Sequence, residues 1–260
     1  MSRVLAAHRL NDYYVAYEIE APEIASKTEP GQLIEVNLGG HGFVLPHAIA
    51  DFSRDKGTVT VVTRNQDNGR TVAYPDVVLK GPLGQRRAFR GVGKILCVAE
   101  GLGVAALYTR LNELKRRGIY TIVIVGFHTR DFVYWIDRLD SISNELYVVT
   151  EDGSYGIKGP IKQTIRAVCE NELDIDRALA IGSLDLLRTC CSITTAHGIR
   201  TIINVNAVLV EDAVPSTPTE GGVLEGAASV SYNWSTESDL EGKDVDFDEL
   251  TQKLGIQIAR

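Results

Sequence analysis

Long apolar runs are missing from this sequence. No stretch approaches the roughly 20 consecutive apolar residues that a membrane-spanning helix needs. The N-terminal segment MSRVLAAHRL also contains too short an apolar run for a secretory signal peptide. We therefore expect a soluble, cytoplasmic protein with no membrane partner.

Cysteine is scarce, with four residues among 260, and none follows Cys191. These residues fall in apolar segments, without a CxxC pair and without nearby histidines that would complete a metal site. We expect reduced, buried thiols rather than disulfides or metal ligands at Cys97, Cys169, Cys190 and Cys191.

A concentration of positive charge is also lacking. The net charge is -7, and between Glu211 and Leu250 eleven acidic residues stand against one basic residue, Lys243. Proteins that bind nucleic acid need a basic face to neutralise phosphates, so we exclude nucleic acid as a partner. The acidic stretch is instead typical of a segment that docks on a basic partner surface, or of a solubilising tail.

The residue patterns of common hydrolases are absent as well. The five histidines show neither HExxH spacing nor a GxSxG nucleophile to pair with. We assign no catalytic side chain and no protein-bound metal from the sequence. Any chemistry must therefore come from cofactors.

The first 92 residues contain short segments rich in Val, Ile, Tyr and Thr, separated by turn residues. Strands at this spacing predict a small antiparallel β-barrel domain over residues 1–92. The expected strands are YYVAYEIEA (13–21), GQLIEVNL (31–38), GTVTVVTR (57–64) and PDVVLKG (75–81).

From residue 93 to residue 210 the pattern alternates between strands and helices, which predicts a doubly wound α/β domain with a parallel sheet. Its strands read as nearly continuous apolar runs, as expected for strands buried on both faces. They are ILCVA (95–99), TIVIV (121–125), LYVVT (146–150), ALAIG (178–182) and TIINV (201–205).

The first helix of this domain has a clear apolar stripe. Glu113 and its polar neighbours should face water, and Gly118 should end the helix. The stripe consists of Val104, Leu107, Leu111 and Leu114.

Residues 211–260 lack a core pattern and are expected to form an acidic, loop-rich appendage. Within it, DVDFDELTQKL (244–254) predicts a short terminal helix with Asp244 or Asp246 as its N-cap.

Two glycines mark the turn between the first parallel strand and the first helix. In AEGLGVAAL (99–107), Gly101 and Gly103 allow a tight turn and a close backbone approach to a ligand, and the helix N-terminus offers N–H groups to a phosphate. The segment does not match GxGxxG, and the same glycines also suit a turn that binds nothing.

Ligands of open α/β sheets bind beyond the carboxyl ends of the strands. There, Arg130 would pair with a phosphate, and Asp152 or Ser154 would hydrogen-bond a ribose or an amide. The alternatives are a solvated arginine and a plain Asp152–Gly153 turn. The loops expected to converge on this rim are residues 100–105, 126–131, 151–159 and 182–185.

Eight segments occur in the order seen in one group of reductases: PGQL (30–33), LPHAIADF (45–52), GPLG (81–84), EGLGVA (100–105), IVGFHTRD (124–131), TEDGSYGIKG (150–159), AIGS (180–183) and DVDFDEL (244–250). The chain resembles the ferredoxin-NADP reductase-like small subunit of NADH-dependent reduced ferredoxin:NADP oxidoreductase, also described as the sulfide dehydrogenase beta subunit. It is similar, more distantly, to the electron-transfer subunit of dihydroorotate dehydrogenase. The resemblance covers nearly the whole chain.

The resemblance implies FAD between the barrel and the second domain, NAD(P)H on the second domain, and a [2Fe-2S] cluster in the C-terminal segment. It also implies a larger catalytic oxidoreductase subunit, or ferredoxin, as the partner. Carried onto this sequence, the cofactor-binding residues are Pro46, Ile49, Ala50, Asp51, Gly69, Arg70, Thr71, Gly81, Gly84, Gly101, Gly103, Val104, Arg130, Asp152, Gly153, Ser154 and Gly182.

The cluster ligands of this family are not matched. They would fall near Thr219, Gly222 and Trp234, where the sequence has no cysteine. Because iron-sulfur clusters depend on cysteine thiolates, we predict that this chain lacks the cluster.

Other departures affect the flavin and nucleotide sites. Val44 and Ala48 stand where the family has an Arg and a Thr or Ser that contact the flavin. Glu100 replaces a Gly and Ala106 a Pro in the nucleotide loop. A carboxylate at residue 100 would repel a pyrophosphate unless it points away or faces the flavin ring.

Three hypotheses remain open from the sequence. The first is an electron-transfer subunit that passes electrons from NAD(P)H through FAD to a partner, without its own cluster. The second is a degenerate scaffold or regulatory subunit of an oxidoreductase complex, since cluster ligands and flavin contacts are lost together. The third is a regulatory module that only binds a nucleotide.

Overall fold

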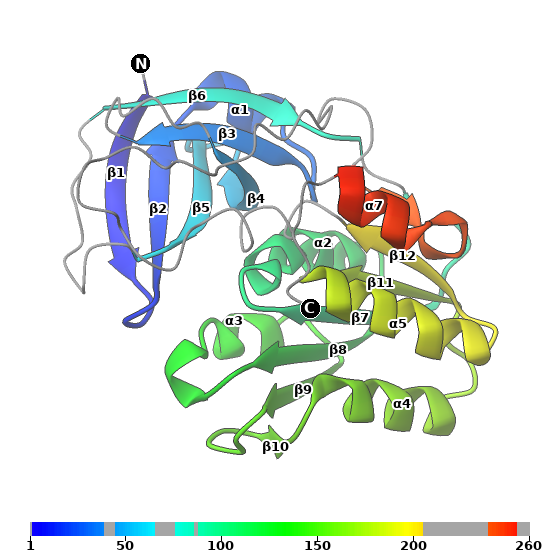
Figure 1. Cartoon of the computed structure of the whole chain (residues 1–260). Helices are drawn as coiled ribbons and strands as arrows, with labels where there is room; N and C mark the ends of the chain where they lie inside the picture. Colours follow the sequence, from blue (N-terminus) through cyan, green and yellow to red (C-terminus); the bar gives the residue numbers. More distant parts are fainter. Residues whose placement is uncertain (1, 39–44, 66–75, 86–87, 205–238, 254–260) are drawn as a thin grey trace.

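The computed structural model describes residues 2–38, 45–65, 76–85, 88–204 and 239–253. It places a closed antiparallel barrel beside a mainly parallel sheet flanked by helices (Figure 1). Both architectures predicted from the sequence are confirmed.

Six strands close the barrel in the order β1-β2-β5-β4-β3-β6, with every neighbouring pair antiparallel. The four predicted strands correspond to β2, β3, β5 and β6, and β1 and β4 complete the closure. Helix α1 (Pro22–Lys27) packs Ala25 against the barrel core. The strands are β1 (Ser2–Arg9), β2 (Tyr14–Glu20), β3 (Leu33–Leu38), β4 (Leu45–Ser53), β5 (Thr58–Arg64) and β6 (Asp76–Leu83).

The second sheet has the strand order β10-β9-β8-β7-β11-β12-β13, parallel except for the last pair. The five predicted strands are β7, β8, β9, β11 and β12, and one further strand lies at each edge. The bounds are β7 (Lys94–Glu100), β8 (Tyr120–Phe127), β9 (Glu145–Thr150), β10 (Ile157–Lys158), β11 (Arg177–Ile181), β12 (Arg200–Asn204) and β13 (Asp239–Glu241).

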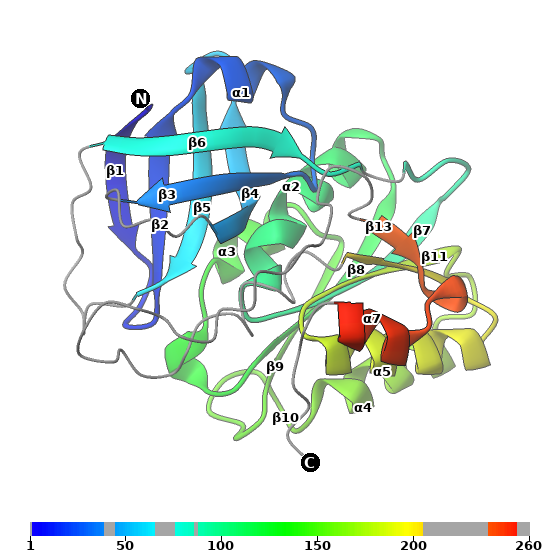
Figure 2. The same ribbon diagram turned by 45° about the horizontal axis from the view of Figure 1, so that its top comes forward.

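Helices cover both faces of this sheet, which explains its nearly continuous apolar strands. Helices α2 and α3 lie on the face toward the barrel, and α4, α5 and α7 lie on the other face (Figure 2). Alternate residues of β7 point to opposite faces of the sheet. Cys97 packs in the core on the side of α2 and α3, and Leu96 and Val98 pack in the core on the side of α4, α5 and α7. The helices are α2 (Gly103–Arg116), α3 (Ile136–Asp140), α4 (Ile161–Asn171), α5 (Leu184–Ala196) and α7 (Phe247–Lys253), with short 3₁₀ turns η1 (Arg130–Phe132) and η2 (Gly242–Asp244).

Helix α2 lies between the sheet and the barrel and contacts β4 as well as β7. Gly118, at φ +68°, follows its C-terminal end, as predicted. Glu113, expected to face water, is only 13% exposed because the helix is covered from both sides. The predicted stripe is fully buried at Val104, Leu107, Leu111 and Leu114.

The end of the predicted appendage belongs to the α/β layer. Strand β13 pairs with β12, and α7 packs against α5. Asp246 Oδ1 accepts hydrogen bonds from the backbone N–H of Asp248 at 2.9 Å and of Glu249 at 3.0 Å. Of the two predicted N-caps, Asp246 is therefore the one that caps α7.

A buried ion pair joins α2 to the start of β13. Arg110 donates to Asp239 Oδ2, and Asn204 donates to Asp239 Oδ1 at 2.9 Å. The guanidinium also lies 5.1 Å from the ring centroid of Phe89, and Gly31 packs against its side chain. One arginine thus connects the barrel, the sheet and the segment that returns to the sheet edge.

The four cysteines are buried, as predicted. Burial raises the pKa of Cys97 to about 12 and that of Cys169 to about 11, so both thiols stay protonated. Among the described helices, none is long and apolar enough to span a bilayer.

Candidate functional site

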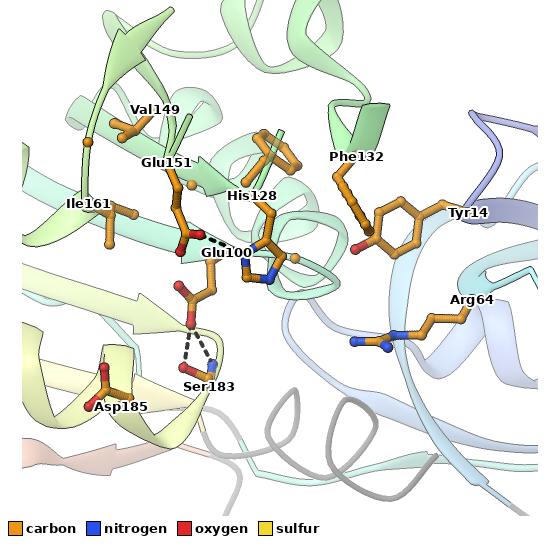
Figure 3. Close-up of a pocket in the computed structure, with 14 residues that line it drawn as sticks. Tyr14, Arg64, Glu100, His128, Phe132, Val149, Glu151, Ile161, Ser183 and Asp185 are labelled. Carbon is orange, nitrogen blue, oxygen red and sulfur yellow. Dashed lines mark hydrogen bonds and ion pairs between the residues drawn. The ribbon is translucent and has the colours of Figure 1, made fainter. Parts of the chain in front are cut away.

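A cavity of about 270 Å³ lies between the barrel and the carboxyl ends of the sheet strands (Figure 3). The four loops predicted to converge on this rim all contribute to it, as the position of ligands in open α/β sheets suggests. Two barrel side chains form the opposite wall. The lining residues are Tyr14, Arg64, Glu100, Gly101, Gly126, Phe127, His128, Phe132, Val149, Glu151, Gly159, Ile161, Ser183 and Asp185.

Glu100 projects into this cavity from the end of β7 (Figure 3). Gly101, at φ +52°, turns the chain directly after it. Ser183 donates to Glu100 Oε1 twice, from its backbone N–H at 3.2 Å and from its hydroxyl. The same hydroxyl accepts from the N–H of Leu186 at 3.1 Å, so Ser183 is the N-cap of α5 and holds Glu100 against the first turn.

Burial raises the pKa of Glu100 above its ordinary value. The hydrogen bonds from Ser183 act in the opposite direction, Asp185 raises the pKa further, and His128 lowers it. Space for this side chain comes from Gly182, where a Cβ would lie 2.8 Å from Glu100 Cγ. The predicted glycine at 182 therefore makes room for a carboxyl group of the protein itself.

Acidic groups outnumber basic ones around the cavity. Glu100, Glu151 and Asp185 face His128 and Arg64 (Figure 3). His128 Nδ1 lies 3.0 Å from Glu151 Oε2, with side chains 72% and 65% exposed. Water screens this outer pair more than it screens the inner carboxyl of Glu100.

The wall nearest the barrel is aromatic. Tyr14 and Phe132 line the cavity, with ring centroids 6.3 Å apart in an edge-on arrangement. Tyr13 also stacks on Phe132, with ring centroids 3.9 Å apart. Arg64, at the end of β5, adds a guanidinium to this wall (Figure 3).

The glycine turn predicted to bind a nucleotide is tightly packed. A Cβ on Gly103 would lie 2.8 Å from the carbonyl carbon of Ile181. The hydroxyl of Tyr134 donates to the carbonyl of Gly101 at 2.9 Å and accepts from the N–H of Ala105 at 3.1 Å. Close packing of α2 on β11 therefore explains the glycine at 103, whether or not a ligand binds there.

Three polar residues that were predicted to bind a ligand, Arg130, Asp152 and Ser154, lie close together next to the cavity lining. Ser154 Oγ accepts from the N–H of Arg130 at 2.7 Å and donates to Asp152 Oδ1 at 2.6 Å. The backbone N–H of Ser154 donates to the same carboxylate oxygen at 3.0 Å, and these two hydrogen bonds from Ser154 lower the pKa of Asp152. Gly153 has φ +78°, so the Asp152–Gly153 turn exists, and the Arg130 guanidinium lies 5.9 Å from the Tyr155 ring centroid.

The predicted cofactor residues of the barrel lie on or beside β4 and β6. Ile49 is buried in the barrel core, and Ala50 in the apolar cluster that the barrel shares with α2. Asp51 Oδ2 accepts from Arg138 on α3 at 2.5 Å. These side chains are committed to packing or ion pairing, so any ligand contact here would use the backbone. Pro46 is on β4, Gly81 is on β6 and Gly84 follows it, whereas Val44, Gly69, Arg70 and Thr71 lie outside the described residues.

In the part of the chain that the structure describes, no three His, Cys, Asp or Glu side chains cluster as metal ligands. The positions where family cluster ligands would fall, Thr219, Gly222 and Trp234, lie outside it. The lack of an iron-sulfur cluster therefore stays a prediction from the sequence.

Sequence reasoning did not identify the barrel side of the cavity. Tyr14 and Arg64 come from antiparallel neighbours, β2 and β5, where they pair in register. Phe132 follows the predicted loop at 126–131 by one residue. No motif distinguishes these residues in the sequence.

Comparisons with known proteins agree with this architecture. No family model matches the chain. A homolog of the electron transfer subunit of dihydroorotate dehydrogenase B (NAD(+)) from Thermotoga maritima is 26% identical over 248 residues, covering 91% of this chain and 84% of the relative. The electron transfer subunit of that enzyme from Fusobacterium nucleatum is 32% identical over 171 residues, covering 61% of this chain and 66% of the relative.

Solved structures show the same fold. A chain of the NADH-dependent reduced ferredoxin-NADP oxidoreductase, studied for flavin-based electron bifurcation, superposes with a TM-score of 0.75 at 24% identity, covering 98% of this chain and 93% of that one. A ferredoxin NADP+ reductase from Neisseria gonorrhoeae with bound FAD and NADP gives a TM-score of 0.62 at 15% identity over 76% of this chain and 90% of that one. The chain therefore has the ferredoxin reductase-like fold and is similar in sequence to electron transfer subunits of dihydroorotate dehydrogenase B.

Proposed function

We propose that this chain is a cytoplasmic electron-transfer subunit of a multi-subunit oxidoreductase, which moves electrons between NAD(P)H and a larger catalytic subunit through FAD. In this proposal residues 1–92 form the flavin domain, 93–210 the NAD(P) domain and 211–260 an acidic appendage. The similar proteins named as electron transfer subunits support the role. The FAD and NADP bound to the Neisseria reductase support the choice of cofactors.

The observation that carries the proposal is the cavity where four strand-end loops meet two barrel side chains. Hydride exchange between two cofactors requires their rings to meet in one oriented site. The cavity volume of about 270 Å³ is near the lower end for small-molecule sites, so it holds only part of a dinucleotide.

The lining residues fit a planar ring. Tyr14 and Phe132 offer aromatic contacts, and the lack of side chains at Gly101 and Gly126 allows a ring to approach the backbone closely. Arg64 is the basic side chain on the barrel wall that would meet a phosphate. When bound, FAD and NAD(P)H supply hydride and single-electron chemistry, while these residues bind, orient and exclude water.

The proposal includes no iron-sulfur centre in this chain, because no cysteine follows Cys191. Electrons would then reach the larger subunit, or ferredoxin, without that intermediate carrier. The acidic stretch between Glu211 and Leu250 suits a basic docking surface on such a partner.

Cofactor analysis of the purified complex tests this function. We expect about one flavin per chain, with an absorbance band at about 450 nm. NAD(P)H should bleach this band in the absence of oxygen. No iron should be assigned to this chain. Protein that is colourless and takes up no added FAD would remove the proposal.

A scaffold or regulatory role is the second candidate, and three observations favour it. Helix α2 packs directly on β4, and Asp51 is held by Arg138 rather than left open to a ligand. The cavity lining also contains three acidic side chains, which would repel the phosphates of a dinucleotide. A colourless chain that co-purifies with a catalytic subunit would support this role, whereas a lone monomer from the native host would exclude it.

A further inference from the structure

Glu100 takes the place that an anionic ligand group would take at the start of α5. Helix N-termini bind anions because their first N–H groups have no partner within the helix and carry the positive end of the dipole. Here the backbone N–H and the hydroxyl of Ser183 both donate to Glu100 Oε1. A carboxyl group of the protein thus uses donors that face the cavity.

The surroundings fit this side chain closely. Ser183 Oγ accepts from the N–H of Leu186, so its one hydroxyl proton is directed at Glu100. Gly182 leaves the space in which Glu100 Cγ lies. The carboxyl is therefore held in the cavity and does not point away from it, which excludes one of the two alternatives left open by the sequence.

Charged groups from the neighbouring elements also face Glu100. Asp185 lies on α5, Glu151 and His128 lie after β9 and β8, and Arg64 lies on β5 across the cavity (Figure 3). Burial favours the neutral form of Glu100, and its pKa is raised.

We propose that Glu100 sets the ligand specificity of the cavity, because its carboxylate, held by the donors of Ser183, repels a nucleotide phosphate that approaches the start of α5. A dinucleotide then binds tightly only when this carboxyl is neutral or displaced. The inference rests on the proposed function, since it concerns the nucleotide of that same site.

The direction of the pH dependence follows from the charge. Below its pKa Glu100 is neutral and opposes a phosphate little; above its pKa it is negative and repels it. The diester pyrophosphate of NAD⁺ or ADP-ribose stays negative throughout. Nucleotide affinity should therefore fall as the pH rises through the pKa of Glu100, and rise again as the pH falls.

Calorimetric titration of the full chain with ADP-ribose and with NAD⁺ tests this directly, from about pH 4, near the ordinary pKa of a glutamate, to about pH 8.5. We expect Glu100→Gln to bind both ligands about tenfold more tightly at the upper end of this range, because one unscreened like charge is removed. The variant should also lose most of the wild-type pH dependence. Glutamine keeps the oxygen that accepts from Ser183, so the fold should be retained, and thermal melting verifies this.

Two controls accompany the variant. Glu145→Gln makes the same chemical change at the start of β9, on the opposite edge of the sheet, where Tyr120 and Tyr147 donate to the carboxylate. It should leave affinity within about twofold, because charges beyond a Debye length are screened. His128→Asn should keep the direction of the wild-type pH dependence and move its midpoint to higher pH, because His128 lowers the pKa of Glu100; loss of the pH dependence in this variant would assign it to His128 instead.

Each outcome decides the inference. Equal affinities for wild type and Glu100→Gln would overturn it, and so would weaker NAD⁺ binding with unchanged ADP-ribose binding, which would assign the carboxylate to the pyridinium ring. If only the variant binds, the inference holds and the reductase function of the natural chain fails. If wild type binds with no pH dependence, the function stands and the inference fails, and if neither protein binds, both fail.

Discussion

Replacing Arg110 with methionine is expected to lower the free energy of unfolding by about 3–5 kcal/mol, measured by urea denaturation with tryptophan fluorescence. The side chains of Arg110 and Asp239 are 1% and 0% exposed. Methionine keeps much of the apolar volume but leaves the buried carboxylate of Asp239 without its compensating charge. Removing one partner of a buried ion pair is far more destabilising than replacing both partners with apolar residues.

A matched control uses an exposed pair of the same kind. Arg188 donates to Asp248 at 2.7 Å, with side chains 46% and 79% exposed, so Arg188→Met should change stability by less than about 1 kcal/mol. The double variant Arg110→Met with Asp239→Asn should regain at least half of the loss, because the buried charge is gone. If Arg110→Met and Arg188→Met lower the free energy of unfolding equally, the buried ion pair contributes no more to stability than the exposed one.

Replacing Gly103 with alanine is expected to destabilise the fold by about 3 kcal/mol, at the upper end of the usual range for overpacking. The new Cβ would lie 2.8 Å from the carbonyl carbon of Ile181 and 3.2 Å from the backbone nitrogen of Gly182. Backbone atoms of a central strand cannot rotate away as a side chain would. Separation of α2 from β11 would follow, and thermal or urea unfolding would detect it.

Gly93→Ala provides the comparison for this variant. The nearest atom to a Cβ at residue 93 is Asp176 Oδ2, at an ordinary contact distance of 3.4 Å. Stability should change by no more than about 0.5 kcal/mol. If Gly103→Ala is as mild as Gly93→Ala, the close approach of α2 to β11 is not a constraint on the fold.

Strand and helix periodicity predicted most of the architecture because burial repeats along each element. The parallel strands read as apolar runs since helices cover both faces, and the stripe of α2 is buried as expected. Strands β1 and β4 were missed because their patterns are weak: β1 has no buried residue, and the register of β4 shifts between Ile49 and Asp51.

Arg110 shows a different limit of sequence reasoning. It follows Leu107 by one helical turn and thus lies at the edge of the apolar stripe, where an arginine normally reaches solvent. Its partner Asp239 lies 129 residues further along the chain, so no local pattern identifies the pair. Tyr14 and Arg64 line the cavity for a similar reason, since register within the barrel, and no motif, brings them together.

The candidate site was predictable where topology determines it. Carboxyl ends of parallel strands meet at one edge, so the four loops had to converge. The orientation of one side chain was not predictable, and Glu100 is the decisive case. Only the hydrogen bonds from Ser183 and the space at Gly182 place its carboxyl in the cavity.

Hydrogen exchange of the purified complex, with and without FAD and NAD⁺, tests most directly whether this cavity is the ligand site. Backbone amides of residues 100–105, 126–131 and 182–185 should exchange more slowly when the ligands are present, together with those near Tyr14 and Arg64, while the far edge of the sheet around Glu145 stays unchanged. The assignment of a redox cofactor site to the junction of barrel and sheet would be contradicted if saturating ligand slowed exchange only in other segments. It would also be contradicted if the ligands slowed exchange nowhere in the chain.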